Sequence, residues 1–212
     1  MLAASLMPIS AAGAAETDAL QQEIDEVLAT TEGGVQISRN EIAWNGGEAI
    51  LVFPLPGESA APVSSASAQK LQAKVAGLPL STTEEEPAGV DPESGVSIAA
   101  SDSCPTETFG NDWYCFYQYT NYGGRRLQWN ASKDTYSPVY FSAYGFENKT
   151  SSWSNKGGLT IDVRNRSKTG SDQSCSAVGG GIRLWLEAEH SRSSNVGAAD
   201  DNKADCFWTY DF

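Results

Sequence analysis

Apolar and aromatic positions in the second half of the chain recur in short runs that Gly, Asn, Ser and Asp separate. Within the runs, β-branched and aromatic residues predominate, and turns such as 121–124 and 156–158 lie between them. Strands at such short spacing predict an all-β sandwich or barrel. The predicted strands are residues 113–119, 125–129, 151–154, 159–165, 181–187 and 205–210.

A different pattern comes earlier, in residues 16–56. Apolar residues first recur with the spacing of one helical face, and a Gly-Gly pair ends that pattern. Two β-rich runs, 35–38 and 48–53, then flank a turn at 45–47. A small helix and a β-hairpin are together below the size that usually folds unaided, so we expect them to dock onto the second half or to act as a pro-segment. The apolar helical positions are Leu20, Ile24, Val27 and Leu28.

Composition separates the two halves of the chain. Residues 1–101 carry 14 acidic and 3 basic side chains and two aromatic residues, whereas residues 102–212 carry 13 acidic, 11 basic, 19 aromatic residues and all four cysteines. A packed core needs large apolar side chains, so residues 102–212 are predicted to form the main folded domain. Residues 57–101 are dominated by Pro, Ser, Ala, Gly and Glu and contain no aromatic residue, which predicts a disordered acidic linker.

The first fifteen residues are predicted to be a signal peptide. A short apolar run over residues 1–9 is followed by the A-x-A cleavage pattern Ala12-Gly13-Ala14. No other stretch approaches the 18 or more apolar residues of a membrane span. We therefore expect a secreted extracellular protein that is not bound to the membrane once the signal is removed.

Four cysteines in one aromatic, Gly-rich domain suit two disulfides in an oxidising compartment. The spacing favours Cys104 with Cys115, around the first strand, and Cys175 with Cys206, which would tie a Gly/Ser loop to the last strand. Four cysteines allow three pairings, and the sequence alone does not choose among them.

The inventory of reactive side chains argues against an enzyme. The single histidine, His190, has neither the H-E-x-x-H spacing of zinc proteases nor a G-x-S-x-G partner, and we expect it on the surface. Glu187 and Glu189 would share one face of an exposed strand edge, where such carboxylate pairs are common. The net charge of −13 repels phosphate backbones, which excludes nucleic acid as the expected partner. We predict no catalytic residue and no organic cofactor.

An internal repeat divides the second half into two units. Asn148-Lys149 lies 54 residues before Asn202-Lys203, and each pair is followed, after two residues, by a β-run. Arg125, Arg126, Arg164 and Arg166 fall in or beside these units, and their balanced charge favours solvated strand edges.

The residues of this half resemble a known family. The run from Cys115 to Leu127, with the aromatic-x-Gly element Tyr122-Gly123-Gly124, is similar to the first hairpin of a βγ-crystallin Greek key, and residues 147–152 are similar to that family's acidic/amide pair followed by Ser/Thr-Ser. With Cys104-Pro105 and the signal peptide, the chain resembles actinobacterial peptidase inhibitor family I36, which is related to the Streptomyces metalloproteinase inhibitor. The first unit carries the closer resemblance.

The resemblance implies both a fold and a function. It implies a mainly β protein with a two-Greek-key βγ-crystallin-like sandwich at residues 102–212, acting as a monomer that blocks an extracellular protease, with a metalloprotease as the first candidate. The implied protease-binding loop is extended and held rigidly, so that little entropy is lost on binding. The segment that fits this description includes Ser174, Cys175, Ser176, Ala177 and Val178.

Calcium is the chemical hypothesis that the resemblance adds. A hard cation takes six or more oxygen ligands, and βγ-crystallins supply them from each Asn/Asp-rich element. The alternative function is therefore a non-inhibitory, crystallin-like structural or calcium-binding extracellular module. The candidate ligands are Glu147, Asn148 and Ser151 in the first unit and Asp201, Asn202 and Asp205 in the second.

Overall fold

The computed structural model describes residues 12–75, 77, 102–105, 113–130, 138–166, 175 and 181–210. In that part of the chain eleven strands form two antiparallel sheets, accompanied by two α-helices and two short 3-10 helices. The mainly β fold predicted from the sequence is confirmed.

The N-terminal elements are α1 (Ala12–Thr30), β1 (Val35–Ser38), β2 (Glu41–Trp44), β3 (Ala49–Val52) and α2 (Ala66–Val75). The first repeat unit contains β4 (Trp113–Tyr117), η1 (Thr120–Tyr122), β5 (Arg126–Asn130), β6 (Val139–Tyr140), η2 (Phe141–Tyr144) and β7 (Ser152–Asn155). The second contains β8 (Thr160–Asn165), β9 (Ile182–Glu187), β10 (Ser191–Ser193) and β11 (Cys206–Tyr210).

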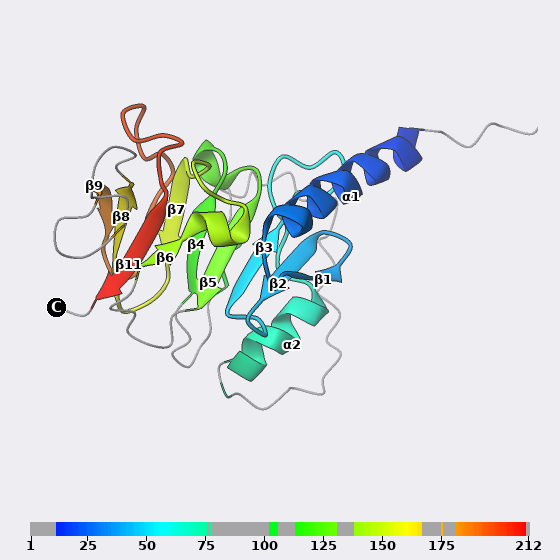
Figure 1. The fold of residues 1–212 in the computed structure, drawn as a ribbon, viewed down its shortest axis with the longest axis horizontal. Helices are drawn as coiled ribbons and strands as arrows, with labels where there is room; N and C mark the ends of the chain where they lie inside the picture. The colour runs from blue at the N-terminus through cyan, green and yellow to red at the C-terminus, as the bar shows by residue number, and fades with distance from the viewer. Residues whose placement is uncertain are drawn as a thin grey trace, which may run out of the picture.

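The two repeat units exchange their third strands. One sheet has the order β1-β2-β3-β5-β4-β7-β10 and the other the order β6-β11-β8-β9. Strands β4, β5 and β7 of the first unit thus share a sheet with β10 of the second unit, whereas β6 joins the second unit's β8, β9 and β11. This arrangement confirms the two predicted Greek keys, which lie at the centre and left of Figure 1.

The 54-residue repeat is a structural equivalence as well as a sequence one. Asn148 and Asn202 both adopt the left-handed conformation, with φ of 55° in each case. The amide of Asn148 donates to the carbonyl of Ala204 at 2.8 Å, and the amide of Asn202 donates to the carbonyl of Thr150 at 3.2 Å. The two elements therefore cross each other at a local pseudo-twofold, which links the units at their turns.

The predicted aromatic-x-Gly corner also forms. Tyr122 packs edge-on against Tyr117, with ring centroids 5.3 Å apart. Gly124 has φ of +71°, and a Cβ placed there would lie 2.7 Å from the Tyr119 ring and 2.8 Å from Gln118 Cβ. Glycine is needed at this position both for the backbone conformation and for the close approach.

Gly124→Ala is expected to lower the free energy of unfolding by about 1–3 kcal/mol, because the added methyl meets packed atoms in a conformation that L-residues avoid. Urea denaturation measures the loss. Gly158→Ala is the matched control, since a Cβ at Gly158 would meet nothing within 4 Å. Equal losses in the two variants would contradict the assignment.

The N-terminal segment extends the sheet of the first Greek key. Strand β3 pairs with β5 over four residue pairs, from Ala49 with Trp129 to Val52 with Arg126. The helix and the turn predicted at residues 45–47 both form, although the helix already begins at Ala12 and the turn extends to Glu48. The predicted hairpin was incomplete, because the four residues of β2, all buried, form a further strand between β1 and β3.

The predicted linker needs a correction over its first part. Residues 57–75 lie against the sheet: Ala60 bridges to Gly124, and α2 buries Ala68 and Gln72. Their low aromatic content does not prevent packing, since small side chains allow α2 to approach the sheet closely. The rest of the predicted linker, residues 78–101, and most of the predicted signal peptide lie outside the described residues.

The main core lies between the two sheets and continues under α1. Phe116 and Trp129 from the larger sheet pack around Phe207 from the smaller one, with centroid separations of 5.0 and 5.4 Å. Ile24 and Val27 of α1 belong to the same cluster. On the opposite face of β2 and β3, α2 covers a second cluster, so both faces of these strands are buried. Figure 1 shows the two helices at the end of the molecule away from β8, β9 and β11.

Candidate functional site

The Cys175–Cys206 disulfide anchors the predicted protease-binding loop. Cys206 begins β11, which lies between β6 and β8 in the smaller sheet. The structure joins it to Cys175 with a Cα–Cα distance of 6.4 Å, and both cysteines are completely buried. The amide of Cys175 also donates to the hydroxyl of Tyr140 on β6, at 3.4 Å. A point in the middle of the loop is thus fixed to an inner strand of the sheet.

The remaining residues of that loop are not placed. Ser174, Ser176, Ala177 and Val178 lie outside the described residues. What the structure gives is the loop's two ends, at Arg166 and Gly181, and its fixed point at Cys175.

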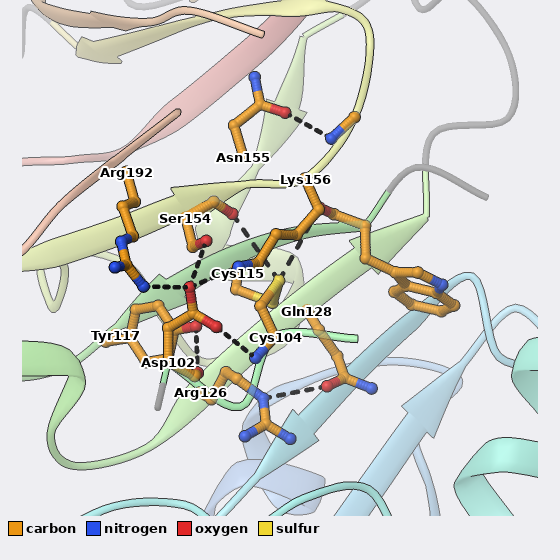
Figure 2. The surroundings of a disulfide bond; sticks show 12 residues. Asp102, Cys104, Cys115, Tyr117, Arg126, Gln128, Ser154, Asn155, Lys156 and Arg192 are labelled. Carbon is orange, nitrogen blue, oxygen red and sulfur yellow. Dashed lines mark hydrogen bonds and ion pairs between the residues drawn. A yellow bond between two sulfur atoms is a disulfide. The ribbon is translucent and has the colours of Figure 1, made fainter. Parts of the chain in front are cut away.

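The second disulfide belongs to a polar cluster that the sequence did not reveal. Cys104 and Cys115 are joined with a Cα–Cα distance of 5.8 Å on the outer face of the larger sheet. Beside them, the buried carboxylate of Asp102 accepts hydrogen bonds from Ser154 Oγ at 2.9 Å and from Lys156 Nζ at 2.6 Å. Figure 2 shows these contacts converging on Asp102.

Asp102 is an anchor for the chain that leads into β4. Burial alone would raise the pKa of Asp102, but hydrogen bonds from Lys156 and Ser154, together with the Lys156 charge, outweigh it and hold the pKa below its usual value. Arg192 lies 3.5 Å away and adds a second positive charge. The hydroxyl of Tyr117 donates to the Asp102 carbonyl. An ionised carboxylate therefore fixes residues 102–105 on the sheet, and the disulfide closes the attachment.

One half of the predicted calcium set comes together at the crossing of the two units. The hydroxyl of Ser151 donates to a carboxylate oxygen of Asp201 and lies 2.9 Å from the carbonyl oxygen of Gln118. Asn202 Nδ2 donates to the other carboxylate oxygen of Asp201, at 3.1 Å. The Ser151 hydroxyl and the Gln118 carbonyl of the first unit thus lie beside the Asp201 carboxylate of the second.

The other half of the set contains an internal cation. The guanidinium of Arg166 forms an ion pair with Glu147, and the Arg166 amide donates to Asp205 Oδ2 at 2.6 Å. Burial raises the pKa of Asp205, and the nearby Glu147 carboxylate adds to the rise. Arg166 therefore supplies the positive charge at these two carboxylates, which makes them a poor fit to calcium. Asn148 takes part in the crossing of the two units through its left-handed backbone conformation and through the hydrogen bond from its amide to the Ala204 carbonyl.

Two sequence expectations about surface charges are wrong. Arg126 is completely buried rather than on a solvated strand edge; its Nε donates to Gln128 Oε1 at 3.0 Å. Glu187 is completely buried at the end of β9, whereas Glu189 is exposed in the following turn, so the two do not share an exposed face. His190 is exposed, as predicted. The alternation of residues along a strand indicates which side chains share a face of the sheet. It does not indicate which other segments of the chain cover that face.

The Glu187 carboxyl is expected to make stability fall as the pH rises. Burial raises the pKa of Glu187 well above 4.5, and a 3.0 Å hydrogen bond from Trp185 Nε1 compensates for this only in part. The folded state therefore holds the proton more tightly than the unfolded chain, so stability is full below the ordinary Glu pKa and is lost as the pH rises through the raised one.

Urea denaturation over a pH series measures this slope. Glu187→Gln is expected to flatten the decline above pH 4.5, because glutamine stays neutral. Glu189→Gln is the control, since Glu189 is exposed. A wild-type pH slope retained in Glu187→Gln would show that other groups cause the decline.

Comparison with known families fits this geometry. The first Greek key, the aromatic-x-Gly corner and the Cys104–Cys115 bond lie where residues 98–167 match a family model. Residues 98–167 match peptidase inhibitor family I36. The I36 match confirms the resemblance seen in the sequence and covers the first Greek key and β8. Neither the curated proteins nor the solved structures gave a significant match to the chain.

The I36 match ends before the loop anchored by Cys175, and the N-terminal segment precedes it. Residues 98–167 are thus similar to a peptidase inhibitor family. No helix in the described part of the chain combines the length and apolar character needed to cross a membrane.

Proposed function

We propose that the protein is a secreted, non-enzymatic inhibitor that binds and blocks an extracellular protease, with a metalloprotease as the first candidate. The observation that carries the proposal is the buried Cys175–Cys206 bond within a chain that matches an inhibitor family. Fixing a loop at its middle lowers the conformational entropy that binding removes. It also keeps the two ends of a cleaved loop attached to the sheet.

The bonding around this anchor supports a rigid presentation. Cys206 pairs with Tyr140 on one side and with Arg164 on the other, so the anchor lies within a hydrogen-bonded ladder rather than at a free edge. Two disulfides also suit a protein that works outside the cell beside proteases. The loop residues that would enter the protease are those from Ser174 to Val178.

The test is a titration of the purified protein against a thermolysin-like metalloprotease and a subtilisin-like serine protease. Inhibition predicts stoichiometric loss of activity while the protein itself stays intact on a gel. Reduced and alkylated protein serves as the control and is expected to be digested. Progressive digestion of the native protein by both proteases would overturn the proposal.

A second candidate, a calcium-stabilised module, is favoured by the oxygens around Asp201. In the described part of the chain no three His, Cys, Asp or Glu side chains gather at one point, so a cation here would depend on hydroxyl and main-chain oxygens as well. Ser151 and the Gln118 carbonyl are those oxygens. Because Arg166 neutralises Glu147, we restrict this candidate to the Asp201 side of the crossing.

Chelation is expected to lower the melting temperature of the wild-type protein by a few degrees, since a ligand at ten times its Kd adds about 1.4 kcal/mol of stability. Asp201→Asn is expected to melt at the same temperature with and without chelator. Asp200→Asn changes the neighbouring carboxylate and should respond as the wild type does. An unchanged wild-type midpoint would contradict a calcium site.

A further inference from the structure

The exposed edge that the first Greek key would otherwise have is occupied by the chain's own N-terminal segment, residues 19–75. Without this segment β5 would be an edge strand of the larger sheet. Strand β3 pairs with it in register, and the amide of Asn130 donates to the carbonyl of Glu48 at 2.8 Å. An unpaired strand edge is a template for association with other chains. The segment therefore completes a sheet that the I36 match alone leaves open.

On the inner face the segment shares the main core. Ile24 and Val27 of α1 lie in one apolar cluster with Phe141 and Phe146, which follow β6. The fit is close at Gly145, where an added Cβ would lie 3.0 Å from Val27 Cγ1. Here α1 packs on the inner face of β2 and β3, in the same apolar cluster that the smaller sheet covers farther along the larger sheet. Removal of the segment would leave these aromatic residues partly uncovered.

On the outer face the segment buries a charge. The guanidinium of Arg126 is completely buried, and its Nη1 donates to the carbonyls of Ala61 at 3.3 Å and Pro62 at 2.8 Å. The nearby Gln128 donates to Ser64 Oγ at 3.1 Å. Burial lowers the pKa of Arg126, because the guanidinium is removed from the water that would stabilise its charge. Such a group is stable in place only while its carbonyl partners remain bound.

We propose that the β5 edge and its two adjoining faces form a constitutive docking surface whose partner is the chain's own N-terminal segment. The segment stays bound as a non-covalent subunit when the connection between residue 77 and the Greek keys is cut. Three sets of contacts bind the segment, and none of them involves that connection. They are the pairing of β3 with β5, the shared apolar core, and the hydrogen bonds from Arg126 to the carbonyls of Ala61 and Pro62. A removable pro-segment, in contrast, would leave the free edge and Arg126 exposed to solvent.

The test cuts the full-length protein at one place. A recognition sequence for a site-specific protease is inserted between Glu85 and Glu86, the folded protein is cut, and the products are run on a size-exclusion column without denaturant. Both pieces are expected to elute together at the volume of the uncut protein. The melting temperature of the cut protein is expected to rise with its concentration, since dissociation has become bimolecular.

Two variants in the segment sharpen the result. Leu51 is completely buried opposite Leu127, so Leu51→Ala is expected to raise the dissociation constant of the cut pieces by roughly tenfold or more. Val35 is 62 % exposed on β1, so Val35→Ala is expected to leave it unchanged. Circular dichroism of each uncut variant tests whether that variant folds. The concentration dependence of melting is measured on the cut wild-type protein, so this result does not depend on either variant.

Separation of the two pieces in native buffer would overturn the proposal. So would a C-terminal piece that, once purified, remains monomeric and melts at the temperature of the uncut protein. Neither readout depends on protease inhibition, so the outcome is independent of the proposed function.

Discussion

Replacing Cys175 and Cys206 together by serine is expected to abolish protease inhibition and to destabilise the Greek keys by about 4 kcal/mol, the loop-entropy value for a closed loop of this size. The two cysteines are 31 residues apart, and the segment between them begins with Ser176, Ala177 and Val178 of the proposed protease-binding residues. Without the bond that loop gains conformational freedom, which must be lost again on binding. The inhibition constant and the urea midpoint measure the two effects.

The other disulfide separates stability from inhibition. Its cysteines are 11 residues apart, so the Cys104→Ser, Cys115→Ser double variant is expected to lose about 3 kcal/mol. It lies on the outer face of the larger sheet, whereas Cys175 is bonded to the smaller sheet. This variant should still inhibit at temperatures where it is folded. Equal loss of inhibition in both double variants would remove the Cys175 loop from the proposed mechanism.

Phe207→Ala is expected to cost about 3–5 kcal/mol, the usual range for removing a buried aromatic side chain. The Phe207 ring contacts those of Phe116, Trp129 and Phe141, with centroids 5.0 to 5.4 Å away. These residues come from both sheets and from η2. The cavity left by Phe207→Ala would therefore lie in the core between the two sheets. Thermal or urea unfolding measures the loss.

The control for this variant is Tyr119→Ala. Tyr119 is 58 % exposed, so its loss is expected to fall within about 0.5 kcal/mol of the wild type, as for other surface positions. A small effect of Phe207→Ala would mean that the core reorganises around the missing ring.

Local patterns identified six of the eight Greek-key strands in the described residues, because runs of aromatic and β-branched residues between clear turns mark them. Strands β6 and β10 were missed because they are only two and three residues long. Strand β2 was also missed. Its residues Glu41–Trp44 are buried on both faces, under α1 and α2, so no alternation marks them. The carboxylate of Glu41 accepts a hydrogen bond from the amide of Ser65, a partner 24 residues away. Only the folded chain brings them together.

The candidate site was predictable where it depends on cysteines and on the repeat. The disulfides connect the cysteines that the spacing favoured, and the 54-residue repeat places Ser151 beside Asp201. The roles of Arg126 and Arg166 were not predictable in this way. Each is defined by the segment that packs on it, and charge counts along the sequence treat a buried arginine and a solvated one alike.

The exchange of third strands between the Greek keys also has a consequence for the rate of folding. Strand β6 pairs with β11, with Tyr140 opposite Cys206, and β10 pairs with β7, with Arg192 opposite Ser154, so both pairings join strands of different Greek keys. Strand β3 meets β5 only after the whole connection between them has been drawn together. Folding rates fall as contacts become more distant in sequence. The chain should therefore fold slowly, on the millisecond-to-second scale.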